Sequence, residues 1–198
     1  EFLIQSYVKS YFNRNKRIKI AIARAGNVIG GGDWSEDRIV PDCFKSWSKN
    51  RPVIIRNPHS TRPWQHVMEA LSGYLTLAYN LKKYPNKFHG EVFNFGPTNR
   101  NNYSVKELLL FIKKKNKYAN WVEKKTNHLY ESKLLKLNSN KARKLLKWKN
   151  ILSFNETLDL IVSWYNNFYF ETNRKKKNIY EKTKSQIEFF QKKLQKKL

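Results

Sequence analysis

The segment Ile18–Ala23 most constrains the fold of this 198-residue chain, because a short apolar run passes directly into a glycine-rich one. Its β-branched, nearly continuous apolar residues are typical of a strand covered on both faces in a parallel sheet. Gly26 and the glycines at 30–32 follow, where glycine permits close approach to the backbone. Taken alone, such a group of glycines more often marks a simple turn than a ligand site. Because ligands collect at the carboxyl ends of strands in open α/β sheets, the pattern predicts an α/β fold with a ligand loop at 25–37.

Helical periodicity and capping residues predict the other elements. Apolar residues recur at helical spacing near the start, which predicts a helix over 1–13 with one buried face. Two Ser-x-x-Glu sequences are capping boxes that predict helix starts near 105 and 154. In a further predicted helix, over 67–81, Leu71, Leu75 and Ala78 are expected to face inward. The remaining expected elements are strands at 18–24, 53–56, 92–95 and 134–137, and helices at 39–49 and 139–146.

The net charge of +25 raises nucleic-acid binding as a hypothesis. The basic residues are 30 lysines and only 10 arginines, and 22 asparagines accompany them, which indicates a genome poor in G and C. Specific recognition of bases and phosphates relies mainly on arginine, so we expect nonspecific contacts with nucleic acid only. A basic nucleic-acid-binding module stays the alternative from another functional class.

Hydropathy, cysteine and histidine content narrow the class of protein. No apolar run reaches the 18 residues of a membrane-spanning helix, and the first residues do not resemble a signal peptide, so we expect a cytoplasmic location. Cys43 is the single cysteine, and its place in a predicted amphipathic helix favours a buried structural thiol. The four histidines lack metal-ligand spacing, so no metal site is expected.

Five segments, taken in order, resemble one family. They are RAGNVIGGGDW (24–34), DRIVPD (37–42), VIIRNP (53–58), TRPWQHVMEALSGYL (61–75) and EVFNFGP (91–97). The sequence is similar to the C-terminal part of the extended short-chain dehydrogenases/reductases, and most of all to their branch that dehydrates CDP-glucose. Weaker similarity runs through 131–148 to Trp164-Tyr165. The resemblance implies a Rossmann-like domain with a mixed α/β substrate-binding region at 1–170, followed by a basic helical tail at 171–198.

The same resemblance implies an NAD-dependent lyase that forms a 4-keto-6-deoxy sugar nucleotide, a reaction of deoxysugar and lipopolysaccharide biosynthesis. Family members carry a glycine-rich NAD-binding turn and a Tyr-x-x-x-Lys catalytic pair, and the sequence contains neither in the required context. Tyr180 and Lys184 have that spacing but fall in the charged tail, so we expect no catalytic residue here. The chain is expected to begin just after the catalytic lysine and to be inactive alone, either as a truncated gene product or as one part of a split enzyme with a separate N-terminal half. When complete, the enzyme is expected to form a homo-oligomer.

The resemblance also assigns candidate site residues. Ala25 and Gly26 would lie beside the nicotinamide of NAD, and Asn27 would contact the diphosphate of CDP-glucose or a similar sugar nucleotide. Arg38 would contact the nucleotide. Arg62 is the stronger candidate for a phosphate ligand, because Pro63 restricts the backbone before it to an extended form that projects its forked guanidinium.

Alternatives to these assignments stay open at this point. Asn27 could be a plain turn residue, Arg62 a surface ion pair, and His66 a packed, hydrogen-bonded side chain beside the site. Another dehydratase or epimerase of the same superfamily is the alternative function. In the tail, the spacing of Ile187 and Phe190 predicts a solvated helix, with a membrane- or partner-bound amphipathic helix as the alternative.

Overall fold

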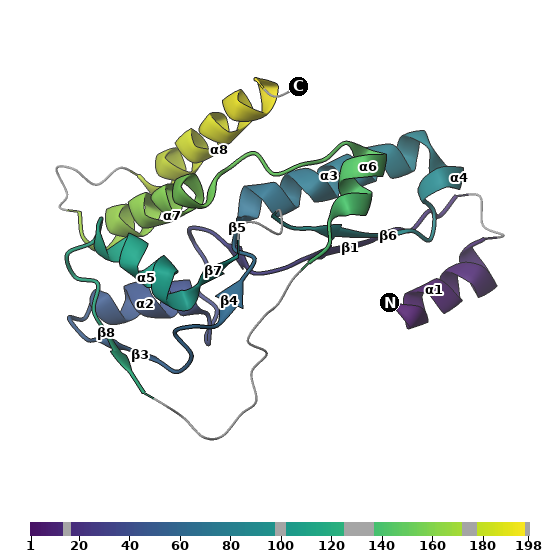
Figure 1. Cartoon of the computed structure of the whole chain (residues 1–198). Helices are drawn as coiled ribbons and strands as arrows, with labels where there is room; N and C mark the ends of the chain where they lie inside the picture. Colours follow the sequence, from purple (N-terminus) through teal and green to yellow (C-terminus); the bar gives the residue numbers. More distant parts are fainter. Residues whose placement is uncertain (14–16, 98–101, 125–136, 172–177, 197–198) are drawn as a thin grey trace.

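The computed structural model describes residues 1–13, 17–97, 102–124, 137–171 and 178–196, and shows a mixed α/β fold (Figure 1). The helices are α1 (Phe2–Tyr7), continued by the π-helical turn η1 (Val8–Phe12), α2 (Ile39–Trp47), α3 (Val67–Lys83), α4 (Pro85–Phe88), α5 (Val105–Lys113), α6 (Asn140–Leu146), α7 (Phe154–Tyr169) and α8 (Ile179–Gln195). The strands are β1 (Ile22–Ala25), β2 (Val28–Ile29), β3 (Val53–Ile55), β4 (Thr61–Arg62), β5 (Gln65–His66), β6 (Val92–Phe95), β7 (Tyr103–Ser104) and β8 (Trp121–Glu123). The expected fold class is confirmed.

One βαβ unit consists of β1, α3 and β6. β1 and β6 pair in parallel from Ile22 opposite Val92 to Ala25 opposite Phe95, and α3 runs along them (Figure 1). Both carboxyl ends therefore lie at the same edge, where the glycine-rich segment begins. The strand expected at 18–24 is shorter than predicted, since β1 begins only at Ile22. It is also less covered, because among the described residues it pairs with β6 alone and Ile18 is 42% exposed.

β3 and β8 also pair in parallel, and α5 precedes β8 in the chain. Leu108, Leu109 and Ile112 of α5 are fully buried in a core that also contains residues of α2 and α7. The predicted capping box at the start of α5 is confirmed: Ser104 Oγ accepts from the N–H of Glu107, and the Glu107 carboxylate accepts from the N–H of Ser104. The strand expected at 134–137 lies outside the described residues except for Leu137, which is in a loop.

The inward face of α3 was predicted wrongly. Leu71 is 49% exposed, Leu75 is 72% exposed and Ala78 is also exposed. Leu71 and Leu75 instead border an apolar groove of about 700 Å³ between α3 and α8. The buried face contains Gly73 and Leu77, because a small residue at 73 lets the helix lie close against β6. Large apolar side chains therefore do not mark the packed face of this helix.

Gly73→Ala is expected to lower the free energy of unfolding by about 2 kcal/mol, because a Cβ at this position would lie 2.3 Å from Cδ1 of the buried Phe95. Alanine normally stabilises a helix relative to glycine, so intrinsic propensity alone gives the opposite sign. Urea unfolding of the two proteins measures the difference. Leu75→Ala on the same helix is the control and should change stability much less, and a stabilised Gly73→Ala variant would contradict this packing.

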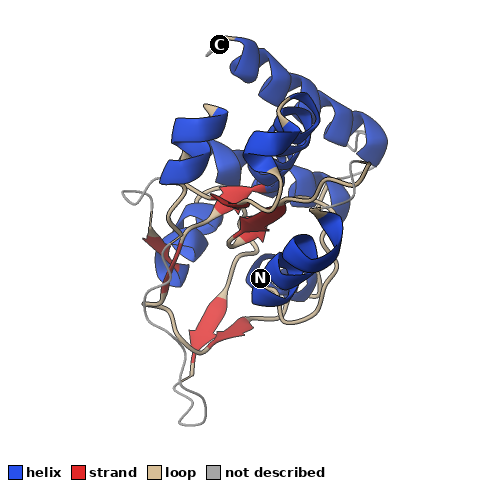
Figure 2. Cartoon of the chain, turned by 90° about the vertical axis from the view of Figure 1, so that its right-hand side faces the viewer, coloured by secondary structure: helices blue, strands red, loops and turns tan. Residues whose placement is uncertain are grey.

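The α1 helix exposes more apolar surface than expected. The sequence predicts one buried face over 1–13, but Phe2, Leu3 and Tyr7 are each more than half exposed. Val8 is the buried residue of the α1–η1 segment. Figure 2, in which the N-terminus faces the viewer, shows this helix on the outside of the molecule rather than enclosed by other elements.

The helix of the basic tail, α8, is packed against the fold, which corrects the expectation of a solvated helix. α8 lies along α7 (Figure 1), and its Phe190 is 5% exposed in a cluster with Met68, Ile151 and Leu152. Gln186 Nε2 donates to the carbonyl of Leu160 at 2.7 Å. No helix among the described residues is both long and apolar enough to span a membrane.

Candidate functional site

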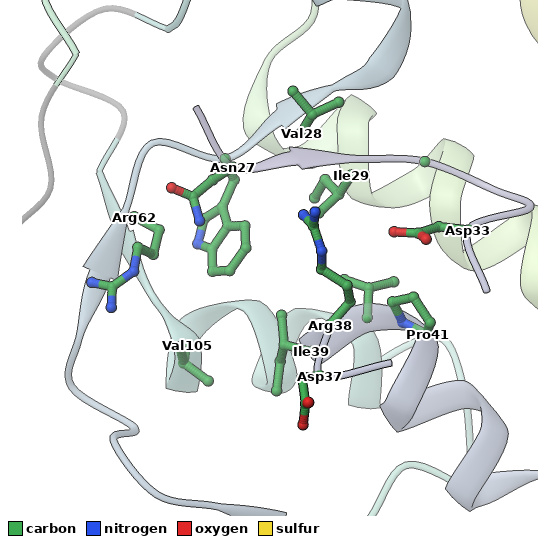
Figure 3. Close-up of a pocket in the computed structure, with 13 residues that line it drawn as sticks. Asn27, Val28, Ile29, Asp33, Asp37, Arg38, Ile39, Pro41, Arg62 and Val105 are labelled. Carbon is green, nitrogen blue, oxygen red and sulfur yellow. The ribbon is translucent and has the colours of Figure 1, made fainter. Parts of the chain in front are cut away.

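A cavity of about 210 Å³ lies beyond the carboxyl end of β1, between the glycine-rich segment, the start of α2 and β4 (Figure 3). Its walls include Asn27, Arg38 and Arg62, the three residues expected to contact substrate. They come from separate parts of the sequence, and the fold brings them together. The floor is apolar, with contributions from Ile39 and Trp64.

The two cations are oriented differently. Figure 3 shows the Arg38 side chain extending between Asn27 and Asp33, whereas the Arg62 guanidinium points away from the other labelled side chains. Arg62 Nη1 donates to the carbonyl of Thr61 at 2.9 Å. Arg38 is the N-cap residue of α2, and the start of a helix also favours an anion. A diphosphate in the cavity would meet Arg38 directly and would require a side-chain rotation of Arg62.

Carboxylates also line the cavity. Asp33 and Asp37 are both in its walls. Asp42, one turn into α2, has a pKa raised above its ordinary value, by burial first and then by the charge of Asp37. Arg38 and the two aspartates line the cavity and Arg62 can join them by rotating, so its polar walls can both neutralise a diphosphate and accept hydrogen bonds from sugar hydroxyls.

The glycine segment is fixed by the pair Trp164-Tyr165 of α7. A Cβ at Gly31 would lie 2.3 Å from Cγ of Trp164, so glycine is required there by the protein's own packing. The Tyr165 hydroxyl donates to the carbonyl of Asp33 at 2.9 Å, and burial raises its pKa. Trp34 lies against the same helix, with its ring centroid 4.9 Å from that of Phe168. Gly31, interpreted from sequence as making room for a ligand, instead makes room for α7, whereas Gly30 lines the cavity.

Ala25 is the last residue of β1 and Gly26 follows it, and neither residue lines the cavity. A Cβ at Gly26 would lie 3.7 Å from both Leu137 and Pro63, an ordinary contact distance, so these side chains already cover that side of the glycine. The described residues contain no group of three or more histidine, cysteine, aspartate or glutamate side chains placed to hold a metal ion.

His66 and Cys43 are structural. The His66 ring is 2% exposed and caps α3, with Nδ1 accepting from the N–H of Met68 at 3.3 Å. Burial lowers its pKa to about 4, so the ring is neutral at pH 7. Cys43 is fully buried, and burial raises the pKa of its thiol, which suppresses the reactive thiolate. Both sequence interpretations, a packed histidine and a structural thiol, are confirmed.

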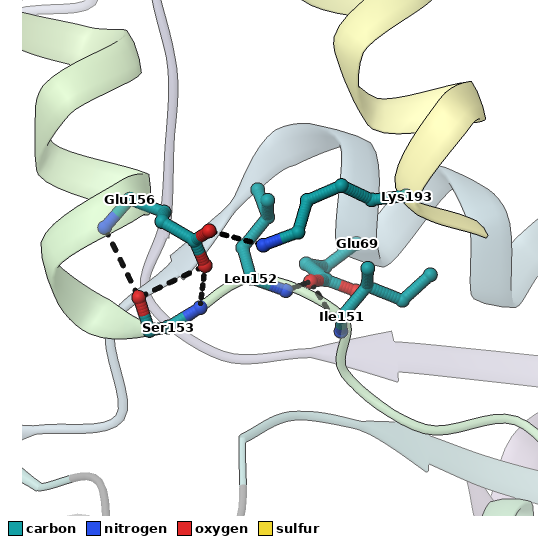
Figure 4. Close-up of polar contacts among 6 residues, drawn as sticks. All are labelled: Glu69, Ile151, Leu152, Ser153, Glu156 and Lys193. Atoms are coloured by element: carbon teal, nitrogen blue, oxygen red, sulfur yellow. Dashed lines mark hydrogen bonds and ion pairs between the residues drawn. The ribbon is translucent and has the colours of Figure 1, made fainter. Parts of the chain in front are cut away.

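Two glutamates form hydrogen bonds to the segment 151–153, which precedes α7 (Figure 4). Glu69, 1% exposed, accepts from the N–H groups of Ile151 and Leu152 at 2.7 and 2.6 Å. Glu156 completes the second predicted capping box with Ser153 and forms an ion pair with Lys193 of α8. The sequence predicted the capping box but gave no sign of the role of Glu69.

The stabilising effect of Glu156 is expected to disappear in acid. The hydrogen bond from Lys193, followed by that from the Ser153 N–H, lowers its pKa from 4.5 to about 2. Because the folded-state pKa is depressed, the stabilisation is complete above pH 4.5 and is lost as the pH falls toward 2. The side chain is one-third exposed, so solvent screening reduces the effect to about 1 kcal/mol.

This pH dependence can be measured as the stability difference between wild type and Glu156→Gln. Urea unfolding should give the full difference at pH 6 to 7 and progressively less below pH 4.5. Glu188→Gln, an exposed glutamate on α8, is the control and should show little difference at any pH. A Glu156→Gln difference that is constant from pH 7 to pH 3 would contradict the assignment.

Comparison with known sequences gives one curated relative. The chain is 40% identical to the CDP-glucose 4,6-dehydratase of Salmonella typhimurium over 170 residues, which is 83% of this chain and 47% of that enzyme. The chain therefore spans about half the length of the curated relative that it matches. No family model matches the sequence.

Comparison with solved structures gives the same fold. An epimerase of Methanothermobacter thermautotrophicus superposes with a TM-score of 0.69 at 22% identity, over 83% of this chain and 47% of that one. The UDP-glucuronic acid 4-epimerase of Bacillus cereus, solved in complex with UDP-glucuronic acid and NAD, gives a TM-score of 0.67 at 23% identity, over 85% and 50% of the two chains. The similarity again covers about half of each relative.

Proposed function

Because this chain has the fold of the extended short-chain dehydrogenases/reductases and is a homologue of CDP-glucose 4,6-dehydratase, we propose that it forms the sugar-nucleotide-binding part of such an enzyme. The complete enzyme would be an NAD-dependent lyase that converts CDP-glucose to CDP-4-keto-6-deoxyglucose. Residues 1–170 would form this part, and α8 would fasten the basic tail at 171–198 to it.

The cavity is the observation that carries the proposal. Asn27, Arg38 and Arg62, which are distant in sequence, converge on one space at the carboxyl end of β1. A diphosphate suits this space because guanidinium groups offer paired, charge-assisted hydrogen bonds to phosphate oxygens. The carboxylates of Asp33 and Asp37 can accept from sugar or ribose hydroxyls. The chain would thus bind and orient the substrate.

In the proposed enzyme, the NAD-binding turn and the catalytic pair would come from outside these 198 residues. NAD would accept and return a hydride in the complete enzyme, and Ala25 and Gly26 would supply one edge of its site. The sequence has no glycine-rich dinucleotide turn, and Tyr180 and Lys184 lie on α8 without lining the cavity. We therefore expect these residues alone to bind sugar nucleotide without turnover. A separate N-terminal half, assembly as a homo-oligomer and a cytoplasmic location complete the proposal.

A selectivity titration combined with a turnover assay tests this function. Purified chain is titrated with CDP-glucose, UDP-glucose and dTDP-glucose, and each mixture is then incubated with NAD and analysed for 4-keto sugar. Tightest binding of CDP-glucose without product is the expected result. Tightest binding of UDP- or dTDP-glucose would assign the chain to another dehydratase or epimerase. Product formation by the chain alone would overturn the claim that it lacks the catalytic apparatus.

A further inference from the structure

Gln65 of β5 lies beside the cavity without lining it, and its side chain is 2% exposed. Its Nε2 donates to the carbonyl of Gly26 at 3.1 Å and to that of Phe95 at 2.8 Å. Its own backbone N–H donates to the carbonyl of Asn27 at 3.2 Å. Gln65 therefore holds the peptide groups on both sides of Asn27 and ties them to the carboxyl end of β6.

Asn27 needs such support. Its φ is +41°, in the left-handed region that is unfavourable for residues other than glycine and persists where the surroundings impose it. Its Oδ1 is buried with no hydrogen-bond partner among the described residues, so that oxygen does not fix the side chain. Because Oδ1 is not anchored in this way, the position of the carboxamide depends on the backbone that carries it, and Gln65 holds that backbone.

We propose that Gln65 is a positioning residue, which acts on the sugar nucleotide through Asn27 and makes no contact with the ligand itself. The inference rests on the proposed function, because it assumes that Asn27 contacts the bound nucleotide. Without the two side-chain hydrogen bonds, the Gly26–Asn27 turn can relax toward negative φ, and the Asn27 carboxamide leaves the cavity wall. Gln65 thus sets affinity from outside the cavity.

A double-mutant cycle on CDP-glucose affinity tests the proposal. Gln65→Met keeps the size of the side chain and removes both donors, and Asn27→Gly removes the carboxamide while tolerating the positive φ. Each single change should lower affinity about tenfold, the loss expected for one well-placed hydrogen bond. If Gln65 acts through Asn27, the double variant should also lose only about tenfold. Independent roles would give about a hundredfold loss and would overturn the proposal.

A control separates positioning from loss of stability. Trp148→Phe removes a buried hydrogen bond to Ser72 Oγ at 3.0 Å, away from the cavity, and should leave affinity within about twofold. Gln65→Leu also removes the side-chain donor without burying a charge, so it serves if the methionine variant does not fold. Wild-type affinity in folded Gln65→Met or Gln65→Leu protein would contradict the proposal.

Amide hydrogen exchange without nucleotide keeps the two hypotheses distinguishable. If wild-type chain does not bind CDP-glucose, the proposed function fails, and the positioning role is then decided by exchange over 27–30 alone. Exchange in this segment should be faster in the Gln65 variant and unchanged in Trp148→Phe. Equal exchange rates in wild type and the Gln65 variant would refute the positioning role, whatever the ligand.

Discussion

Glu69→Ala is expected to lower the free energy of unfolding by about 4 kcal/mol, the largest stability effect of a single side chain considered for this chain. The carboxylate accepts from two buried N–H groups, those of Ile151 and Leu152. Its removal takes this acceptor from both buried amides, at a cost of about 1 to 3 kcal/mol each. The segment before α7 would loosen, and with it the contacts of the cluster that includes Met68 and Phe190.

Urea unfolding at pH 7 measures the effect, and two further variants locate its cause. Glu69→Gln keeps one carbonyl oxygen in the same place and should recover about half of the loss. Glu188→Ala removes an exposed carboxylate from α8 and should stay within about 0.5 kcal/mol of wild type. If Glu69→Ala and Glu188→Ala cost the same, the buried hydrogen bonds do not stabilise this fold.

Arg62→Ala is expected to weaken CDP-glucose binding about thirtyfold, the largest effect of one cavity residue on affinity. A guanidinium can pair with two phosphate oxygens at once, and a charge-assisted pair of this kind contributes about 2 kcal/mol. Because the Arg62 guanidinium points outward and donates to Thr61, binding must include its rotation toward the ligand. That rotation reduces the net binding free energy contributed by Arg62, but the affinity still depends on its positive charge.

The shape of the side chain can be separated from its charge. Arg62→Lys keeps the positive charge and loses the fork, so its affinity should lie between those of wild type and Arg62→Ala. Arg51→Ala, an exposed arginine after α2, is the control and should leave affinity unchanged. Equal affinities of wild type and Arg62→Ala would remove Arg62 from the binding site.

Local signals predicted the longer elements well. The capping boxes at Ser104 and Ser153 mark their helix starts because the capping interaction involves residues only three apart. β2, β4, β5 and β7 were not predicted, since each has two residues and exists through pairing with a distant partner. The packed face of α3 was also missed, because it depends on the approach of Phe95 to Gly73 rather than on a stripe of large apolar residues.

The candidate site was predicted through resemblance more than through local pattern. Asn27, Arg38 and Arg62 line one cavity as a site would require, but nothing in their spacing shows that they meet. Gln65 and Glu69 were missed because their roles depend on carbonyl and amide groups of remote segments. The pair Trp164-Tyr165, noted only as weak similarity, proved to hold the glycine segment in place.

Calorimetric titration of the purified 198-residue chain with CDP-glucose tests the central claim most directly. Saturable binding at one site per chain is expected, and the Arg38→Ala/Arg62→Ala double variant should lose it while its unfolding transition stays cooperative. Absence of binding by folded wild-type chain, or undiminished binding by the double variant, would contradict the assignment of this cavity to a sugar nucleotide.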